Sequence, residues 1–308
     1  MNNTVMSLFQ ALPLPVQTKE KLLYFGKSGY WVDLEEPKCF NEKILWRKLK
    51  SKNPLFTPCT DKVTVRDYVR EKVGEEYLIP LLYSGPSLEP EQLLALGDRV
   101  VVKANHDCGS SVLIHENTPE KAEQACAKLR KALATDYGAT RNEWWYRDIK
   151  PQAMVEKLIV APDGGPASDF KFIMVKDAEG NQHTILFVVY DRGTPDECCC
   201  YYNDRGEVLY WNGTPVCISR FTHRVVPFPC PEHLDDMLAV ARKLSEDFDH
   251  VRVDLYLTNE GIKFGELTFS LGAGRNIWSP QEYDEHLGAL WAIEDPAWNP
   301  APPSLANS

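Results

Sequence analysis

The chain contains 308 residues, of which 44% are hydrophobic and 25% are charged, and it carries a formal net charge of −10. This length and composition are typical of a globular protein with a large core, built as one domain or as several lobes. The acidic balance argues against a nucleic-acid partner, because phosphate backbones are bound by basic surfaces. It is compatible with a local basic pocket for a small anion.

Cysteine usage and the N-terminal segment predict a cytoplasmic protein. The nine cysteines form no CxxC pair and no Cys/His spacing typical of a metal site. We interpret the run Cys198-Cys199-Cys200 as buried or edge-strand residues rather than as a redox site. The N-terminus lacks the basic start and long apolar core of a signal peptide, and no apolar run approaches the ~18 residues of a membrane span.

The N-terminal third reads as polar and mainly helical, with apolar residues at helical spacing in FNEKILWRKLKSKNP and TDKVTVRDYVREKVGEEY. Proline and glycine then interrupt the pattern, which suggests a boundary near residue 97. Next, RVVVKAN and SVLIHEN predict a hairpin around the small-residue loop NHDCGSS. Thr118 and Pro119 predict the start of a helix, and Gly138 is expected at its far end.

Strands resume in AMVEKLIV, DFKFIMV and HTILFVVYD, separated by turn-forming segments. The helix PEHLDDMLAVARKLSEDF follows, and its predicted buried side comprises Leu234, Met237, Leu238, Ala241, Leu244 and Phe248. A hairpin, HVRVDLYLTNEGIKFGELTFS, comes next, and the tail after Trp298 is rich in Pro, Ala, Ser and Asn. This order of elements predicts an α+β protein.

The pairing within the last hairpin follows from its turn. A three-residue loop ending in Gly261 predicts that Asp254 pairs with Glu266 and Arg252 with Thr268. Side chains alternate along a strand, so these four share one face. The core face then comprises Val251, Val253, Leu255, Leu257, Leu267 and Phe269.

Two carboxylates directly opposite one another, about 5 Å apart at their Cβ atoms, repel each other. A divalent cation would remove this penalty. The alternative is a solvated face on which Arg252 neutralises both Asp254 and Glu266.

Three further sets of residues are candidates for chemistry. Lys103 ends a strand and faces a loop containing Gly109, Ser110 and Ser111, where backbone amides can approach phosphate oxygens. The spacing is not that of a Walker A loop, and an ordinary hairpin turn is the alternative. The other two sets are Glu156-Lys157-Leu158-Ile159 at a strand end and Asp169-Phe170-Lys171 at a strand start, and each taken alone also fits a solvated strand end.

The ordered combination of these motifs resembles the ATP-grasp fold of carboxylate-activating ligases. More specifically, WWYRDIKPQAMVEKL, FKFIMV, LAVARKLSEDFDHVRVDLY and KFGELTFSLGAGR resemble the TupA-like ATP-grasp family, which is associated with bacterial teichuronopeptide, capsule and surface-polysaccharide biosynthesis. The resemblance implies two α+β lobes that grip ATP. We therefore expect a helical region at 1–97, a small lobe at 98–165, a large lobe with a metal site at 166–298, and a flexible tail at 299–308.

The resemblance also implies roles for individual residues in binding ATP. Lys103 would reach the phosphates, and the segment from His106 to Ser111, including Gly109 and Ser110, would close over the nucleotide. Asp169 would suit the ribose and Lys171 the phosphates or an acyl phosphate. The residues expected along the adenine are Glu156, Lys157 and Ile159.

The same resemblance makes Asp254 and Glu266 ligands of magnesium, which typically takes one or two carboxylates plus substrate phosphates. Many ATP-grasp enzymes have asparagine two residues after this glutamate. Here the position is Thr268, which suits contact through water and puts a second metal in doubt. Arg252, with Lys103 and Lys171, would act on the transferring phosphoryl group. The candidates for substrate binding are Arg192, Ser270, Gly272 and Arg275, although a plain loop is an equally good interpretation of SLGAGR.

The predicted function is an ATP- and magnesium-dependent ligase that joins a carboxylate to an amine or amino acid through an acyl phosphate. The carboxylate is expected to be a uronic acid of a surface polysaccharide or its nucleotide-sugar precursor. A kinase that phosphorylates a hydroxyl, and a nucleotide-binding module without catalysis, are the rival hypotheses. The sequence does not determine the oligomeric state or the identity of either substrate.

Overall fold

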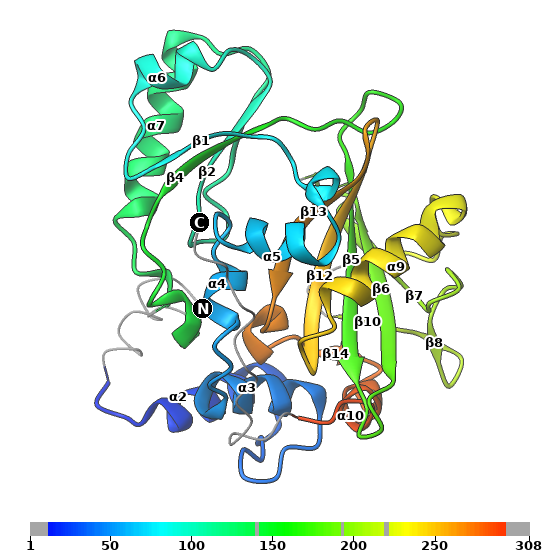
Figure 1. Cartoon of the computed structure of the whole chain (residues 1–308). Helices are drawn as coiled ribbons and strands as arrows, with labels where there is room; N and C mark the ends of the chain where they lie inside the picture. The colour runs from blue at the N-terminus through cyan, green and yellow to red at the C-terminus, as the bar shows by residue number, and fades with distance from the viewer. Residues whose placement is uncertain (1–11, 139–141, 192–193, 219–221, 294–308) are drawn as a thin grey trace.

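The computed structural model describes residues 12–138, 142–191, 194–218 and 222–293. Its elements form a four-stranded and a six-stranded sheet, with two short strand pairs and with helices laid on the larger sheets, so the predicted α+β class is confirmed (Figure 1). No helix within these ranges is long and apolar enough to cross a membrane. The α-helices are α2 (Val16–Ser28), α3 (Phe40–Lys50), α4 (Phe56–Thr60), α5 (Val65–Lys72), α6 (Pro90–Ala95), α7 (Pro119–Leu133), α9 (Leu234–Leu244) and α10 (Glu282–Ala289), and the 3-10 turns are η1 (Glu75–Tyr77), η2 (Trp144–Tyr146), η3 (Pro231–His233) and η4 (Leu271–Gly274).

The smaller sheet has the strand order β1-β4-β2-β3, with β1 (Leu81–Gly85), β4 (Ala153–Lys157), β2 (Val100–Ala104) and β3 (Val112–Ile114). The predicted hairpin is confirmed, since β2 pairs with β3 antiparallel. Helices α6 and α7 pack together, and α7 covers one sheet face with its apolar side (Figure 1). The sheet takes β1 from the N-terminal side of residue 97, where the change in composition had suggested a boundary.

Helix α7 begins as predicted and ends earlier than predicted. The Thr118 hydroxyl accepts a hydrogen bond from the amide of Lys121, 3.4 Å away, and Pro119 occupies the first turn. The expected end at Gly138 was wrong, because the helix stops at Leu133. The Thr135 hydroxyl donates to the carbonyl of Lys131 (2.9 Å), so a side chain satisfies a terminal carbonyl without a left-handed glycine.

The larger sheet has the order β11-β7-β6-β5-β12-β13. All neighbours pair antiparallel except β11 and β7. Helices α9 and α5 pack together over one face, and every apolar residue predicted for the buried side of α9 lies in this core. The strands are β11 (Thr222–His223), β7 (Cys198–Tyr202), β6 (Gln182–Tyr190), β5 (Ser168–Lys176), β12 (His250–Thr258) and β13 (Gly261–Thr268), with short pairs formed by β8 (Tyr210–Trp211) with β9 (Thr214–Pro215) and β10 (Cys217–Ile218) with β14 (Trp278–Ser279).

The opposite face of this sheet is divided in two. Over β6 and β7 it is apolar and packs against α3 and α10, and Tyr201 and Phe187 stack there at 4.8 Å. Cys198, Cys199 and Cys200 are buried in β7 with free thiols, as predicted for a strand. The face is polar at the start of β5, where Asp169 and Lys171 lie, and on the neighbouring parts of β12 and β13, whereas Ile173 and Val175 further along β5 belong to the apolar half. The candidate residues gather on the polar half.

The β12–β13 hairpin has the predicted pairing at the site but a different turn. Arg252 lies opposite Thr268 and Asp254 opposite Glu266, as expected. The predicted three-residue loop was wrong, because the strands are joined by two residues and a bulge at Gly265 restores the register. A Cβ at this position would lie 2.9 Å from the Tyr256 ring and 3.1 Å from the Asp254 carbonyl oxygen. Only glycine fits this bulge without displacing its neighbours.

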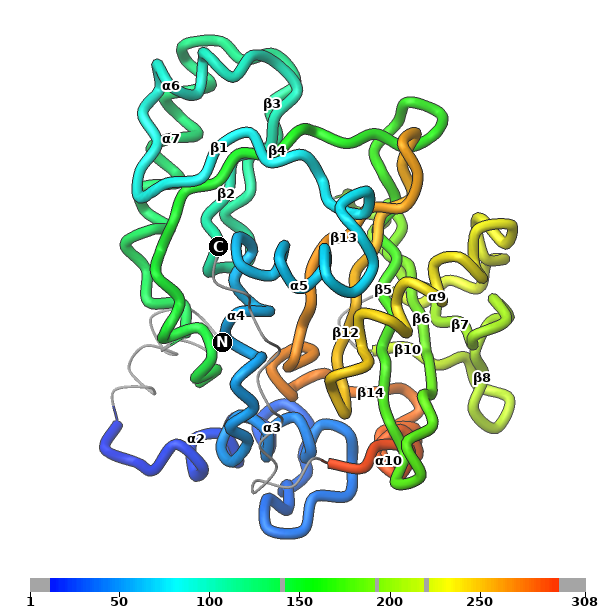
Figure 2. The backbone as a smooth tube through the Cα atoms, viewed as in Figure 1, coloured from blue at the N-terminus to red at the C-terminus, as the bar shows by residue number. Residues whose placement is uncertain are grey.

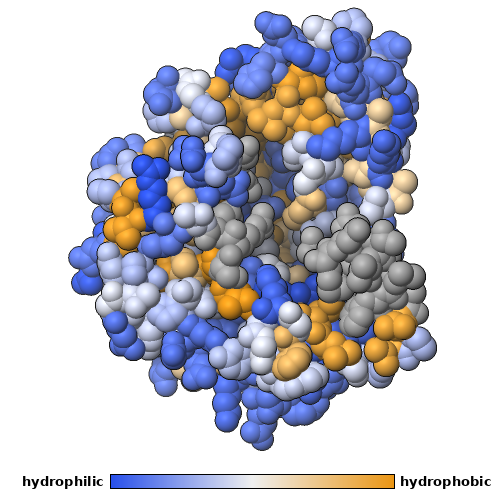
Figure 3. Space-filling view, turned by 180° about the vertical axis from the view of Figure 1, so that it is seen from behind, coloured by the Kyte–Doolittle hydropathy of each residue, from blue (hydrophilic) through white to orange (hydrophobic). Residues whose placement is uncertain are grey.

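The segment from residue 158 to 167 joins the two sheets, since it leads from the end of β4 into β5 (Figure 2). Seen from behind, the molecule is hollowed between the part that carries the small sheet and the rest of the chain (Figure 3). Helix α4 contacts the outer strand β13, and α4 and α5 lie between the two larger sheets in Figure 1. Helices α4 and α5 are therefore packed into the body of the protein.

Candidate functional site

The polar half of the large-sheet face carries six of the predicted site residues. They lie on three neighbouring strands, and the pairing of the strands aligns them in rows across the sheet. Asp254 occupies the centre, opposite Lys171 on one side and Glu266 on the other. The six residues are Asp169 and Lys171 on β5, Arg252 and Asp254 on β12, and Glu266 and Thr268 on β13.

Arg252 bridges the two opposed carboxylates. Its Nε and Nη2 donate to the two oxygens of Asp254 at 2.6 and 2.7 Å, and Nη2 also donates to Glu266 Oε1 at 2.5 Å. Thr268 Oγ1 donates to the same Glu266 oxygen at 3.3 Å. The arginine balances the charge of the pair, as the alternative to a cation predicted, but Asp254 is buried rather than on a solvated face.

The two carboxyls differ in pKa. Burial raises the pKa of Asp254 to about 6, against the opposing attraction of Arg252 and Lys171. Burial also acts on Glu266, but attraction to Arg252, Lys62 and Lys171 outweighs it and lowers that pKa below its usual value. The side chain of Glu266 is 32% exposed and that of Asp254 only 5%, so Glu266 is the more accessible carboxylate.

Lys171 and Asp169 extend this charged row on β5. The Lys171 ammonium contacts the Asp169 carboxylate and lies 3.6 Å from Asp254 Oδ2. Lys171 is only 5% exposed, so its charge is held inside the face rather than in solvent. Lys171 therefore places a buried cation next to two carboxylates, Asp169 and Asp254.

Strands β2 and β4 of the small sheet carry a second charged cluster around Glu156, which is 6% exposed. Lys103 Nζ lies 2.6 Å from Glu156 Oε2, and Arg66 Nη1 lies 3.4 Å from Oε1. Arg66 comes from α5 and was not predicted, because a charged residue on a polar helix reads as solvent-exposed. The cluster brings Lys103 and Glu156 together as neighbours on β2 and β4.

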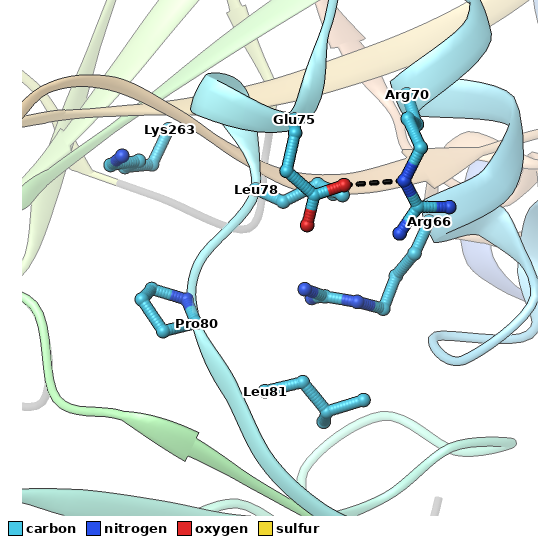
Figure 4. A pocket seen from close by; sticks show the side chains of 7 residues that line it. All are labelled: Arg66, Arg70, Glu75, Leu78, Pro80, Leu81 and Lys263. Atoms are coloured by element: carbon cyan, nitrogen blue, oxygen red, sulfur yellow. Dashed lines mark hydrogen bonds and ion pairs between the residues drawn. The ribbon is translucent and has the colours of Figure 1, made fainter.

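Arg66 also lines a cavity of about 510 Å³ next to this cluster. Figure 4 shows its guanidinium pointing into the cavity, whereas Arg70 is held by Glu75. The cavity adjoins the end of β4, since the Pro80 carbonyl accepts from the Lys157 amide at 3.0 Å. Its lining comprises Arg66, Arg70, Glu75, Leu78, Pro80, Leu81 and Lys263.

The loop from His106 to Ser111 is fixed by its own side chains. Ser110 Oγ donates to Asp107 Oδ1 at 2.6 Å and accepts from the Ala104 amide at 3.2 Å. His106 is buried, with Nε2 3.2 Å from the Thr135 carbonyl, so its ring packs within the small-sheet unit. Gly109 has φ +98°, a conformation that favours glycine, and Ser111 is exposed.

Lys62 ties this loop to the carboxylate pair. Its ammonium donates to the Asp107 carbonyl, and its charge helps to lower the pKa of Glu266. Lys62 and the loop that it holds therefore lie near Glu266. Lys62, like Arg66, is a cation that sequence reasoning missed.

The remaining candidates are less central. Lys157 is exposed and pairs with Glu260 in the hairpin turn at 2.6 Å, and Ile159 is half-buried.

Among the candidates for substrate binding, Ser270 is buried and contacts the Glu143 carboxylate. Gly272 has φ +56°, and a Cβ there would meet the Asn276 side chain at 2.3 Å. Arg275 is bound to the Glu20 carboxylate, while Arg192 and the predicted tail lie outside the described residues.

A family model described as TupA-like ATPgrasp matches residues 42–292. The chain therefore belongs to the TupA-like ATP-grasp family, as the sequence motifs indicated. A search of curated proteins found no match.

Several solved structures are distantly similar. N5-carboxyaminoimidazole synthetase from Staphylococcus aureus has 11% identity and a TM-score of 0.37, with 68% of this chain and 44% of that chain covered. D-alanine-D-alanine ligase from Coxiella burnetii has 11% identity and a TM-score of 0.39, with 68% and 47% covered. This chain thus spans less than half of either protein, and the family assignment rests on the family model.

The residues present fit a magnesium ion only if other ligands join them. Within the described ranges, no group of three or more His, Cys, Asp or Glu side chains is placed to hold a metal. Asp254 and Glu266 supply two hard carboxylates on one face, the number that magnesium commonly uses together with substrate phosphates. Arg252 now occupies both, so binding of a cation requires its guanidinium to give up at least one contact.

Proposed function

We propose that this protein is an ATP- and magnesium-dependent ligase that joins a carboxylate to an amine. The observation that supports it best is the row Lys171–Asp254–Glu266 with Arg252 across it, beside a glycine loop held by Lys62. Cations and carboxylates in one buried row suit a triphosphate, which brings negative charge and metal together.

A carboxylate is a poor electrophile, so its oxygen first attacks the γ-phosphorus of ATP, and ADP leaves. The amine nitrogen then attacks the acyl carbon, the C–O bond to phosphate breaks, and an amide, inorganic phosphate and a proton are released. Asp254 and Glu266 would hold magnesium, which would neutralise charge on the phosphates. Lys103 and Lys171 bind phosphate oxygens, and Arg252 stabilises charge on the phosphoryl group during transfer.

In this proposal the loop from His106 to Ser111 excludes water from the acyl phosphate. Glu156, Lys157 and Ile159 lie along the adenine, Asp169 contacts the ribose, and Thr268 reaches the metal through water. The carboxylate belongs to a uronic acid of a surface polysaccharide or to its nucleotide-sugar precursor, as the family's association suggests. The nitrogen nucleophile is a simple amine or the amino group of an amino acid.

The test is an ADP-release assay in which each substrate is omitted in turn. The protein is incubated with MgATP, UDP-glucuronate and a mixture of amino acids, and products are identified by mass spectrometry. A ligase requires both the carboxylate and the amine for full ADP release and yields an amide. A phosphoester formed without any amine would identify a kinase. Binding of a non-hydrolysable ATP analogue without turnover on any acceptor would support a non-catalytic module.

A further inference from the structure

A fully buried carboxylate lies beside the segment that follows β13. Glu20 of α2 is 0% exposed, and three side chains from other parts of the chain surround it. Arg275 Nη2 donates to both of its oxygens at 2.8 Å, and Lys48 Nζ and Asn142 Nδ2 donate to Oε1 at 3.0 and 2.8 Å. Arg275, Lys48 and Asn142 together donate hydrogen bonds to both oxygens of this carboxylate, and we call these three side chains the donor set.

The two cations of this set need an anion. The side chain of Lys48 is 0% exposed and that of Arg275 is 13% exposed. Removing the partner of a buried ion pair leaves an uncompensated charge, which is strongly unfavourable. Lys48 also donates to the Ala273 carbonyl at 3.2 Å, which holds its ammonium in place within the segment 270–275. The donors therefore stay positioned for a carboxylate, whichever molecule supplies it.

Helix α2, which supplies Glu20, is only lightly attached to the body. Its buried residues are Lys19, Glu20 and Tyr24, whereas Leu22 and Phe25 are 37% and 38% exposed. Tyr24 is the one buried apolar side chain of α2 and packs with Val32, Leu34 and Leu45, while Lys27 Nζ donates to the Arg275 carbonyl at 2.6 Å. Elements with few buried apolar side chains open at low free-energy cost. Figure 1 shows α2 at the periphery of the molecule.

The donor set is connected to the proposed catalytic face through the chain. Arg275 and Ser270 follow the strand that carries Glu266, and Ser270 contacts Glu143, the neighbour of Asn142. A carboxylate bound by Arg275 would therefore be held by the segment that directly follows the strand of Glu266.

We propose that Lys48, Arg275 and Asn142 form a binding site for the carboxylate group of a substrate, and that Glu20 occupies this site until that ligand displaces it. The identification of the ligand as a substrate rests on the proposed function. The displacement of Glu20 by the carboxylate of another molecule does not depend on it. The amine substrate of the ligase then carries a carboxylate of its own, as an amino acid does.

Hydrogen exchange of the wild-type protein tests the displacement without ATP or catalysis. Sodium propionate is the probe, with propionamide as the neutral isostere and sodium chloride at equal ionic strength as controls. We expect only propionate to speed amide exchange in Val16–Ser28. The increase should be about tenfold at a propionate concentration ten times the dissociation constant of the open form, in which Glu20 has left the site. Exchange in α7, Pro119–Leu133, should stay unchanged. Equal exchange of α2 in all three solutions would overturn the proposal.

Variants sharpen the result. Glu20→Gln keeps the shape of the side chain but weakens the internal competitor, so propionate should raise its melting temperature more than that of the wild type. Adding Arg275→Met should remove this gain, and Glu285→Gln, an exposed glutamate on α10, should behave as wild type. If ligase activity is present but propionate has no effect on α2, this proposal alone fails. A propionate effect without ligase activity would overturn only the proposed function.

Discussion

Arg252→Met removes the charge that lies between two opposed carboxylates. Arg252 makes three hydrogen bonds of 2.5 to 2.7 Å to Asp254 and Glu266. Methionine keeps the stem of the side chain but leaves both carboxylates on one sheet face without their shared partner. We expect the variant to fold, to be less stable than the wild type, and to turn over slowly.

The magnitude follows from burial. Breaking a buried ion pair typically costs about 3–5 kcal/mol. The lower end, about 3 kcal/mol, applies because Glu266 keeps 32% of its side-chain surface exposed and can be hydrated. The chain has 308 residues. With an unfolding entropy of about 2.1 cal/mol/K per residue, it should lose about 5 °C in melting temperature.

Thermal melts with and without MgCl₂ measure this effect. Magnesium should raise the melting temperature of Arg252→Met more than that of the wild type, because the arginine no longer competes for the carboxylates. The matched control is Arg205→Met, since Arg205 also pairs with a carboxylate two residues away, but at 75% exposure. That exposed pair should contribute under about 1 kcal/mol. Equal melting temperatures for Arg252→Met and wild type would refute the reasoning.

Turnover distinguishes a structural counter-ion from a residue that acts in the transition state. Arg252→Met and Arg252→Lys should both lower kcat, on the order of 10²-fold, with little change in the KM for ATP. Lysine keeps the charge but lacks the planar fork that now holds two oxygens of Asp254 and one of Glu266. Near-wild-type kcat in both variants would assign Arg252 to structure alone.

Three further outcomes are expected. Asp254→Asn and Glu266→Gln should each lower ATP turnover on the order of 10²-fold or more with unchanged circular dichroism, and activity near wild type in both would remove the metal assignment. Lys103→Met should weaken binding of a magnesium-loaded ATP analogue in calorimetry, because it removes the cation 2.6 Å from Glu156, and unchanged affinity would contradict this role. Burial raises the pKa of Asp284 to about 6, above that of the unfolded chain, so its contribution to stability is lost as pH rises from about 4 to about 6. In urea melts, Asp284→Asn should reduce the stability difference between pH 4 and 7 by about 1–3 kcal/mol, and an unchanged difference would refute the assignment.

Local pattern in the sequence determined the β12–β13 hairpin and the start of α7. Alternation and a glycine turn were enough to pair Asp254 with Glu266, because register within a hairpin depends on neighbouring residues. The turn itself was predicted one residue too long, and the predicted pairing at Asp254 still holds because the bulge at Gly265 shifts the register back by one residue. Thr118 and Pro119 set the helix start through bonds within one turn.

Only the tertiary structure decided which distant side chains join these motifs. Arg66 on α5 contacts Glu156, Lys62 ties the glycine loop beside Glu266, and Glu20 fills the donor set around Arg275. Each sits in a helical or polar segment whose local pattern fits a solvated surface equally well. Whether such a residue faces solvent or a buried partner is set by how whole elements pack, and that packing depends on contacts between residues far apart in the chain.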